Sequence, residues 1–164
     1  MGDELGVMVA AQKADAVEMV TILYPPGIIL VQMELFSVAR IPKLRTVADL
    51  QKYASVFKDP EKPSRGRIYG AIPGWMIDQI MFEKYKHYKL DENYNYFRVG
   101  SEAVLFASIA SAYNLGEPWV GYCYEPTWVT GDLDLILLED APYNPKGYKE
   151  GRTEIPKQPL RIVS

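Results

Sequence analysis

Apolar residues recur every three or four positions in three stretches of the chain, and this spacing predicts helices. The stretches are LRTVADLQKYASVF (44–57), MIDQIMFEKYKHY (76–88) and EAVLFASIASAY (102–113). The first begins with a Thr-Val-Ala-Asp sequence that resembles a helix cap, and the third follows Ser101, a typical N-cap, and ends near Gly116. We therefore expect three amphipathic helices.

Short β-rich runs lie between these predicted helices. Two such runs lie on either side of Tyr24-Pro25-Pro26-Gly27. We expect a turn between them, because two prolines forbid a helix there. Alternating strands and helices indicate an α/β fold with a largely parallel sheet, in which ligands bind at the carboxyl ends of the strands. The predicted strands are GIILV (27–31), RIYGAI (67–72), YNYFRV (94–99), WVGYCY (119–124), LDLILL (133–138) and LRIVS (160–164).

Length and charge narrow the classes of protein to consider. With 164 residues, 48% of them apolar, the chain is long enough for one domain with a single core. A formal charge of -3 argues against a nucleic-acid binder, since contacts to phosphates need a basic face. The apolar runs are far shorter than the ~20 residues that cross a bilayer. A secretory signal has a basic region followed by a long apolar core, and residues 1–19 do not show this pattern.

Candidate catalytic groups are few. The only histidine, His87, lies in a charged helical surface, and the only cysteine, Cys123, lies in a predicted strand with no histidine nearby. Paired carboxylates near the sheet edge are the remaining candidates for hydrolysis or metal binding. They are Glu125, Asp132, Asp134, Glu139 and Asp140. We expect no catalysis, no metal and no cofactor.

Two aromatic sites fall at predicted strand ends. In WVGYCYEPTW (119–128) the strand stops at Pro126, so Tyr124, Glu125 and Trp128 should gather at the carboxyl edge of the sheet. Trp75 reaches the same edge from the turn that follows the predicted strand 67–72. Two aromatic rings from separate strand ends would form half of a pocket.

Such a pocket suits a quaternary ammonium group, because aromatic faces attract a cation that forms no hydrogen bonds. The first turn of the helix that opens at Met76 offers free backbone N–H groups for a carboxylate, and Gly74 lets the backbone approach closely. The alternative is that these aromatic residues only pack in the core. We expect that role for Trp119.

Three longer stretches match a known family. They are TVADLQKYASVFKDPEKPSRGRIYGAIPGW (46–75), GSEAVLFASIASAYNLGEPWVGYCYEPTWV (100–129) and DLDLILLEDAPYNP (132–145). Together they resemble the second lobe of the substrate-binding proteins of glycine betaine, proline betaine and choline ABC transporters. The resemblance covers residues 20–164 and implies a three-layer lobe of the periplasmic-binding-protein type II fold.

The resemblance also implies roles for individual residues. The Trp of the PGW turn and the aromatic residue before EPTW are cage residues in that family, which correspond to Trp75 and Tyr124 here. Most relatives carry Trp at the second position, and Tyr keeps a cation-binding face with a smaller ring. Backbone N–H groups of Met76 and Ile77 would hold a ligand carboxylate. The charge of Asp78 would oppose that carboxylate and favour choline.

The resemblance divides the chain into three parts. Residues 1–19 would be an unmatched leader or part of a first lobe and hinge, 20–140 the ligand-binding lobe, and 141–164 a tail that crosses back toward the missing first lobe. Glu125, Trp128, Gly74 and Asp78 would support the cage. In this interpretation the partners are a quaternary amine osmolyte, the membrane permease and the first lobe, and homo-oligomers form through the exposed lobe face. The full-length parent would act outside the cytoplasm, in the periplasm or anchored to the membrane.

Two alternatives stay open at this point. The aromatic residues at the sheet edge would also serve a non-catalytic protein-interaction domain, as an exposed docking patch. The carboxylates near the same edge would serve a hydrolase.

Overall fold

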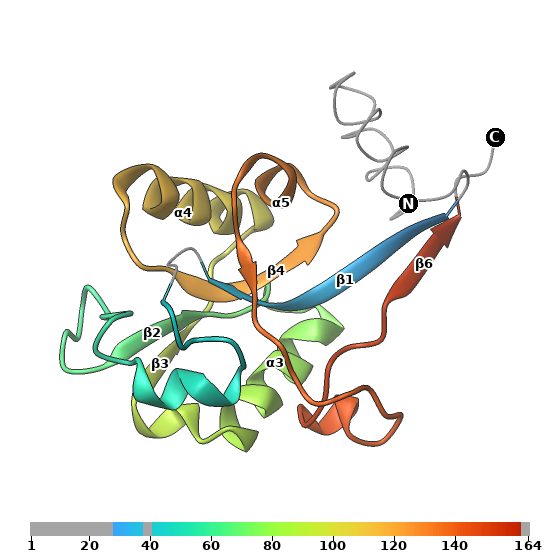
Figure 1. Ribbon diagram of the computed structural model, residues 1–164, viewed down its shortest axis with the longest axis horizontal. Coiled ribbons are helices and arrows are strands. Elements are labelled where there is room, and N and C mark those ends of the chain that lie inside the picture. The colour runs from blue at the N-terminus through green and yellow to red at the C-terminus, as the bar shows by residue number, and fades with distance from the viewer. Residues whose placement is uncertain (1–27, 38–40, 162–164) are drawn as a thin grey trace.

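One mixed sheet organises residues 28–37 and 41–161, the part of the chain that the computed structural model describes. The strand order is β3-β2-β4-β1-β5, and β6 pairs with β1 beside this path (Figure 1). The strands are β1 (Ile28–Ser37), β2 (Gly66–Tyr69), β3 (Tyr94–Phe97), β4 (Val120–Glu125), β5 (Ile136–Leu137) and β6 (Gln158–Arg161).

The sheet is parallel in one half only. Strand β2 runs parallel to β3 and β4, whereas β1 runs antiparallel to β4, β5 and β6. Parallel neighbours need a crossover connection, and helices supply it from β2 to β3 and from β3 to β4. The α/β class predicted from the sequence is confirmed, but the expectation of a largely parallel sheet holds only for β3, β2 and β4.

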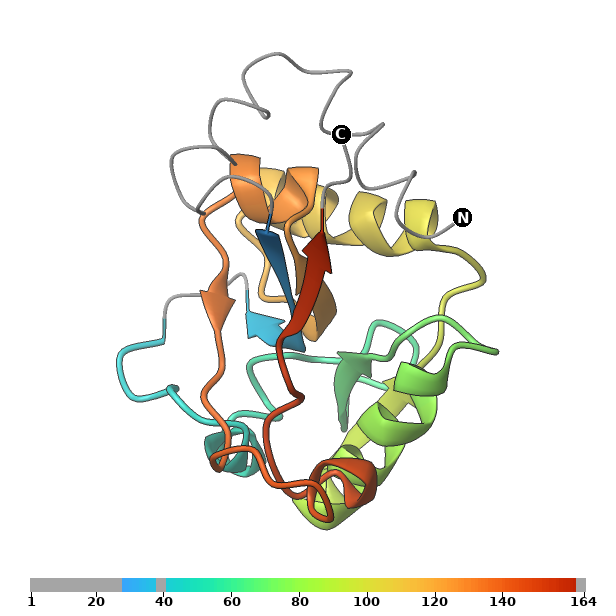
Figure 2. The same cartoon turned by 90° about the vertical axis from the view of Figure 1, so that its right-hand side faces the viewer.

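Helices cover both faces of the sheet and give the lobe three layers. Helices α4 and α5 lie on one face, and α3 lies on the other with the short helix η1 (Figures 1 and 2). The helices are η1 (Ala48–Lys52), α3 (Met76–His87), η2 (Leu90–Glu92), α4 (Glu102–Leu115), α5 (Trp128–Asp132) and η3 (Tyr148–Glu150). None of the helices within these residues has the length and hydrophobicity needed to span a bilayer.

The helix predicted over 44–57 is wrong in length. Only Ala48–Lys52 is helical, as a five-residue 3-10 turn. The predicted cap exists, since the Thr46 hydroxyl donates to Asp49 Oδ2 at 2.8 Å. The backbone just before it pairs with Glu139 instead, whose carbonyl accepts from Val47 N at 2.9 Å. Tertiary pairing therefore overrides the helical spacing here.

The other two predicted helices are confirmed. Ser101 caps α4 by accepting a hydrogen bond from Val104 N at 3.3 Å, and Gly116 ends the helix with a φ of +68°. Trp119 packs in the core as expected: its ring stacks on Tyr69 at 5.2 Å between centroids. The strand and turn predicted over 20–27, residues 1–19 and the end of the LRIVS run lie outside the described residues.

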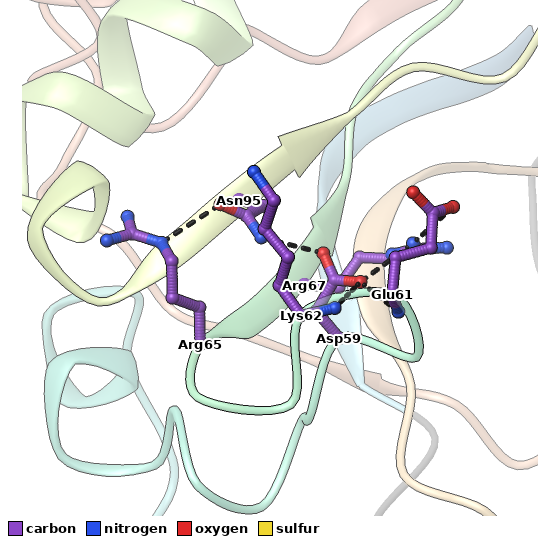
Figure 3. A network of polar contacts seen from close by, with 6 residues as sticks. All are labelled: Asp59, Glu61, Lys62, Arg65, Arg67 and Asn95. Carbon is purple, nitrogen blue, oxygen red and sulfur yellow. Dashed lines mark hydrogen bonds and ion pairs between the residues drawn. The ribbon is translucent and has the colours of Figure 1, made fainter.

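A polar network ties the loop before β2 to strands β2 and β3 (Figure 3). The buried carboxylate of Asp59 accepts hydrogen bonds from Arg67 Nη2 and from Asn95 Nδ2, each at 2.8 Å. The backbone N–H of Glu61 also donates to Asp59, and Arg65 Nε donates to Asn95 at 2.9 Å. One carboxylate thus joins three segments of the chain.

This network predicts how stability depends on pH. Burial of Asp59 acts to raise the pKa of its carboxyl, but hydrogen bonds from Asn95 and Arg67 outweigh burial and hold that pKa well below its usual value. Such a group stabilises the fold above its unfolded pKa of about 3.9 and loses this contribution as the pH falls through the folded pKa. We expect Asp59→Asn to lower the free energy of unfolding at neutral pH, with a smaller difference from wild type below about pH 4.

Urea denaturation of both proteins between about pH 7 and pH 3 measures this difference. Glu61→Gln is a matched control, because Glu61 also contacts Arg67, at 3.1 Å, but leaves 75% of its side chain exposed. The control should change little at any pH. A difference between Asp59→Asn and wild type that stays constant across this range would contradict the prediction.

Candidate functional site

The carboxyl ends of the three parallel strands form one edge of the sheet, and a helix starts there after each strand. Helix α3 follows β2, α4 follows β3 and α5 follows β4. Figure 2 faces the side of the molecule toward which β4 points in Figure 1. The first turns of three helices, with their free N–H groups, therefore lie around this edge. We call it the helix-start edge.

Trp75 is the N-cap residue of α3 and lies at this edge. Its backbone is extended, with φ −81° and ψ 142°, and 40% of the residue is exposed. Gly74 before it has a φ of +92°, which side chains rarely adopt, although a Cβ there would meet nothing within 4 Å. Within the described residues Gly74 is therefore needed for its backbone conformation.

Met76 and Ile77 form the first turn of α3. Met76 is 77% exposed and Ile77 is buried at 8%. Their backbone N–H groups belong to the first helical turn, where no acceptor exists inside the helix. The backbone N–H groups of both residues thus remain at the start of the helix, although their side chains are bulky.

Tyr124 lies near the end of β4 on the face that α4 covers. Its ring is partly buried against Phe106 of α4, with centroids 5.9 Å apart, and lies 6.2 Å from the ring of Tyr122. Its hydroxyl donates to Glu102 Oε2 at 2.6 Å. Burial, with the hydrogen bond to Glu102, raises the pKa of Tyr124, so the phenol keeps its proton.

Trp128 and Glu125 follow at the same edge. Trp128 begins α5 and is 39% exposed, and its ring is perpendicular to that of Phe106, with 6.1 Å between the centroids. Thr127 caps this helix, accepting from Thr130 N while the Thr130 hydroxyl accepts from Thr127 N. Burial raises the pKa of Glu125, and the charge of Lys157 opposes that shift. The exposed fraction of Trp128, 39%, is close to that of Trp75, 40%.

Asp78 does not have the role that was predicted from its charge, which was to oppose a ligand carboxylate. It is buried, and Arg98 Nε donates to both carboxylate oxygens, at 2.9 and 2.8 Å. The Tyr96 hydroxyl donates to it at 3.2 Å. Because Arg98 compensates the charge, Asp78 no longer argues against a carboxylate ligand.

The structure brings the predicted site residues to one edge without joining them directly. Strands β2 and β4 are neighbours, with Tyr69 paired to Gly121; the turn that carries Trp75 follows β2, and Tyr124 lies further along β4, paired with Met33 of β1. Among the described residues the two rings make no contact with each other. Sequence reasoning missed Glu102 and Phe106 of α4, although the start of a helix that follows a parallel strand must lie at this edge.

A family model decides which proteins this chain belongs with. The model for the substrate binding domain of ABC-type glycine betaine transport systems matches residues 7–155. The chain belongs to this family. The match begins further toward the amino terminus than the resemblance described above. No curated protein matches the chain.

Solved structures share the fold of this substrate-binding domain. The glycine betaine, L-proline ABC transporter binding protein ProX from Borrelia burgdorferi is 15% identical, with a TM-score of 0.58 over 90% of this chain and 52% of that one. An ABC-transporter choline binding protein in complex with choline is 16% identical, with a TM-score of 0.55 over 83% and 47%. Lactococcal OpuAC, closed around glycine betaine, is 17% identical, with a TM-score of 0.54 over 80% and 45%.

At these identities the likeness shows the fold, that of a periplasmic-binding-protein type II lobe. The chain spans about half the length of these structures, which fits a single lobe. The family is that of a substrate-binding domain of a transport system.

Two surface hollows are found on the domain, and Met76 at the start of α3 lines one of them. One, of about 500 Å³, is lined partly by Met76, Phe82, Arg98 and Tyr148, between α3 and η3. The other, of about 240 Å³, lies beside Trp119 at the start of β4. Neither hollow is lined by Trp75 or Tyr124.

The groups considered for catalysis are poorly placed in the described residues. Burial raises the pKa of the Cys123 thiol to about 12, which keeps it protonated and unreactive. His87 is exposed. Among the described residues no group of three or more His, Cys, Asp or Glu side chains is placed to hold a metal ion. Asp140, one of the carboxylates considered, pairs with Lys84.

Proposed function

We propose that this domain binds the ammonium end of a quaternary amine at the helix-start edge, between the rings of Trp75 and Tyr124. Glycine betaine, choline and related osmolytes have this chemistry. The observation that carries the proposal is the position of Trp75, which is 40% exposed at the start of α3, beside the strand β4 that carries Tyr124 near its end. A trimethylammonium group between two such rings gains roughly 0.5–2 kcal/mol from each.

The backbone N–H groups of Met76 and Ile77 would hold the carboxylate of a betaine. They point out of the first turn of α3, where the helix dipole also favours an anion. Glu125 and Trp128 would support the cage from the end of β4, and Gly74 sets the turn that presents Trp75.

A second lobe would complete the site. Residues 20–140 would form the ligand-binding lobe, and residues 141–164 would lead back to a first lobe outside this chain. Closure of the two lobes would cover the ligand. The receptor would then deliver the amine to an ABC permease from the periplasm or from a membrane anchor. Because each missing contact removes binding energy while the entropy lost by the ligand remains, we expect this chain alone to bind in the millimolar range.

Titration of this chain with choline and glycine betaine, followed by NMR, tests the proposal. We expect Trp75→Ala and Tyr124→Ala each to weaken binding roughly 2- to 30-fold, in line with the loss of one ring. Tyr113→Ala is the matched control: Tyr113 is an aromatic residue of α4, 36% exposed, and should leave affinity unchanged.

The outcomes separate this function from a docking role. Unchanged affinity in both cage variants would contradict the proposal. It would favour a protein contact surface made of the exposed aromatic residues and Met76, which is 77% exposed. A micromolar Kd for this chain would contradict the expectation that another lobe covers the ligand.

A further inference from the structure

Glu102 is an acidic side chain at the helix-start edge that no basic side chain of the described residues neutralises. Asp78 and Glu102 both belong to the first turn of a helix. Arg98 holds Asp78 through two hydrogen bonds. In the described part of the chain Glu102 forms no ion pair with a lysine or arginine. Its negative charge is therefore available to a ligand at this edge.

A hydrogen bond fixes this charge beside a ring of the proposed cage. The Tyr124 hydroxyl donates to Glu102 Oε2 at 2.6 Å, and Phe106 packs against the same ring from α4. Glu102 is the first residue of α4, so the helix dipole also favours a carboxylate there. The geometry holds an anionic group at the edge of a cation-binding ring.

We infer that Glu102 sets the charge selectivity of the site and favours a quaternary amine with net positive charge over a zwitterion. This rests on the proposed function, because it needs the ammonium to lie on the Tyr124 ring. Choline carries only the cation, which Glu102 attracts. Glycine betaine carries a carboxylate as well, which Glu102 repels, so the two effects largely cancel.

The expected size follows from the geometry of a cation on the ring face. A cation within the usual ~6 Å of the ring centroid lies roughly 7 Å from the Glu102 carboxylate. With the effective dielectric constant of about 20 found near protein surfaces, the attraction at that separation corresponds to a change in Kd of about tenfold or more. Water reaches this open edge, so we take about tenfold as the expected change.

Glu102→Gln tests the inference, because glutamine keeps the length of the side chain and an oxygen that accepts from Tyr124. We expect the Kd for choline to rise about tenfold and the Kd for glycine betaine to change by less than about twofold. Glu102→Asp keeps the charge and should retain the preference for choline. Glu117→Gln makes the same change of charge beyond the far end of α4 and should alter neither affinity.

Each result bears on the inference separately from the proposed function. Equal weakening of both ligands by Glu102→Gln means that Glu102 has a structural role, and no weakening of either means that its charge is not felt. Both results overturn the inference while the losses in Trp75→Ala and Tyr124→Ala leave the proposed function standing. If wild type binds neither amine, the proposed function fails and the inference with it.

Discussion

Replacing Asp140 with alanine is expected to lower the free energy of unfolding by about 3–5 kcal/mol. Asp140 Oδ2 lies 2.5 Å from Lys84 Nζ, and both side chains are completely buried. The Tyr88 hydroxyl donates to the other oxygen of the same carboxylate. Removing Asp140 would leave the Lys84 ammonium buried after the loss of this counter-charge, and such a loss is among the most destabilising changes in a core.

Urea denaturation followed by circular dichroism measures the effect. Glu83→Ala is the control, because Glu83 pairs with Lys86 on the same helix at 3.7 Å with about half of each side chain exposed, and we expect it to change stability by less than about 1 kcal/mol. The double variant Lys84→Met with Asp140→Leu should regain part of the stability lost in Asp140→Ala. A loss below about 1 kcal/mol in Asp140→Ala would show that the pair does not hold the segment after β5 on α3.

Replacing Gly151 with alanine is expected to destabilise the domain more than the same change at Gly116. Both glycines end a helix with nearly the same left-handed backbone, φ +67° and +68°. A Cβ at Gly116 would meet nothing within 4 Å, whereas at Gly151 it would lie 2.1 Å from the backbone nitrogen of Lys84. Because the backbone of α3 cannot yield as a flexible side chain would, the segment after β5 must move away from the helix.

The pair of variants separates backbone strain from steric overlap. Gly116→Ala should cost about 1–2 kcal/mol for the left-handed conformation, and Gly151→Ala should cost a further 1–3 kcal/mol, roughly, for the overlap. Thermal or urea denaturation of the two variants and wild type gives the difference directly. Equal losses in both would mean that η3 does not pack closely on α3.

Local signals in the sequence predicted much of the fold. Helix α4 begins after Ser101 and ends at Gly116, as the capping preferences of these residues indicate. The change from strand to helix at the PGW turn places Trp75 at the start of α3. The helix over 44–57 failed because the backbone at Arg45 and Val47 pairs with Glu139, a contact between segments far apart in sequence. Periodicity carries no information about such pairing.

The candidate site was predictable as a place more than as a set of contacts. Aromatic residues at two strand ends located the helix-start edge, since the carboxyl ends of parallel strands share an edge. The direction of individual charges was not predictable: Asp78 turns to Arg98, which follows β3, while Glu102 turns to Tyr124. These pairings depend on which helix covers which strand, so only the folded chain reveals that Asp78 is compensated by an arginine and Glu102 is not.

The position of the ligand's methyl groups tests the central claim most directly. Isotope-filtered NOE spectra of this chain at saturating choline report which protein protons lie near the trimethylammonium group. We expect NOEs from these methyl protons to the ring protons of both Trp75 and Tyr124. NOEs to the hollow lined by Phe82 and Tyr148, with none to Trp75 and Tyr124, would contradict it.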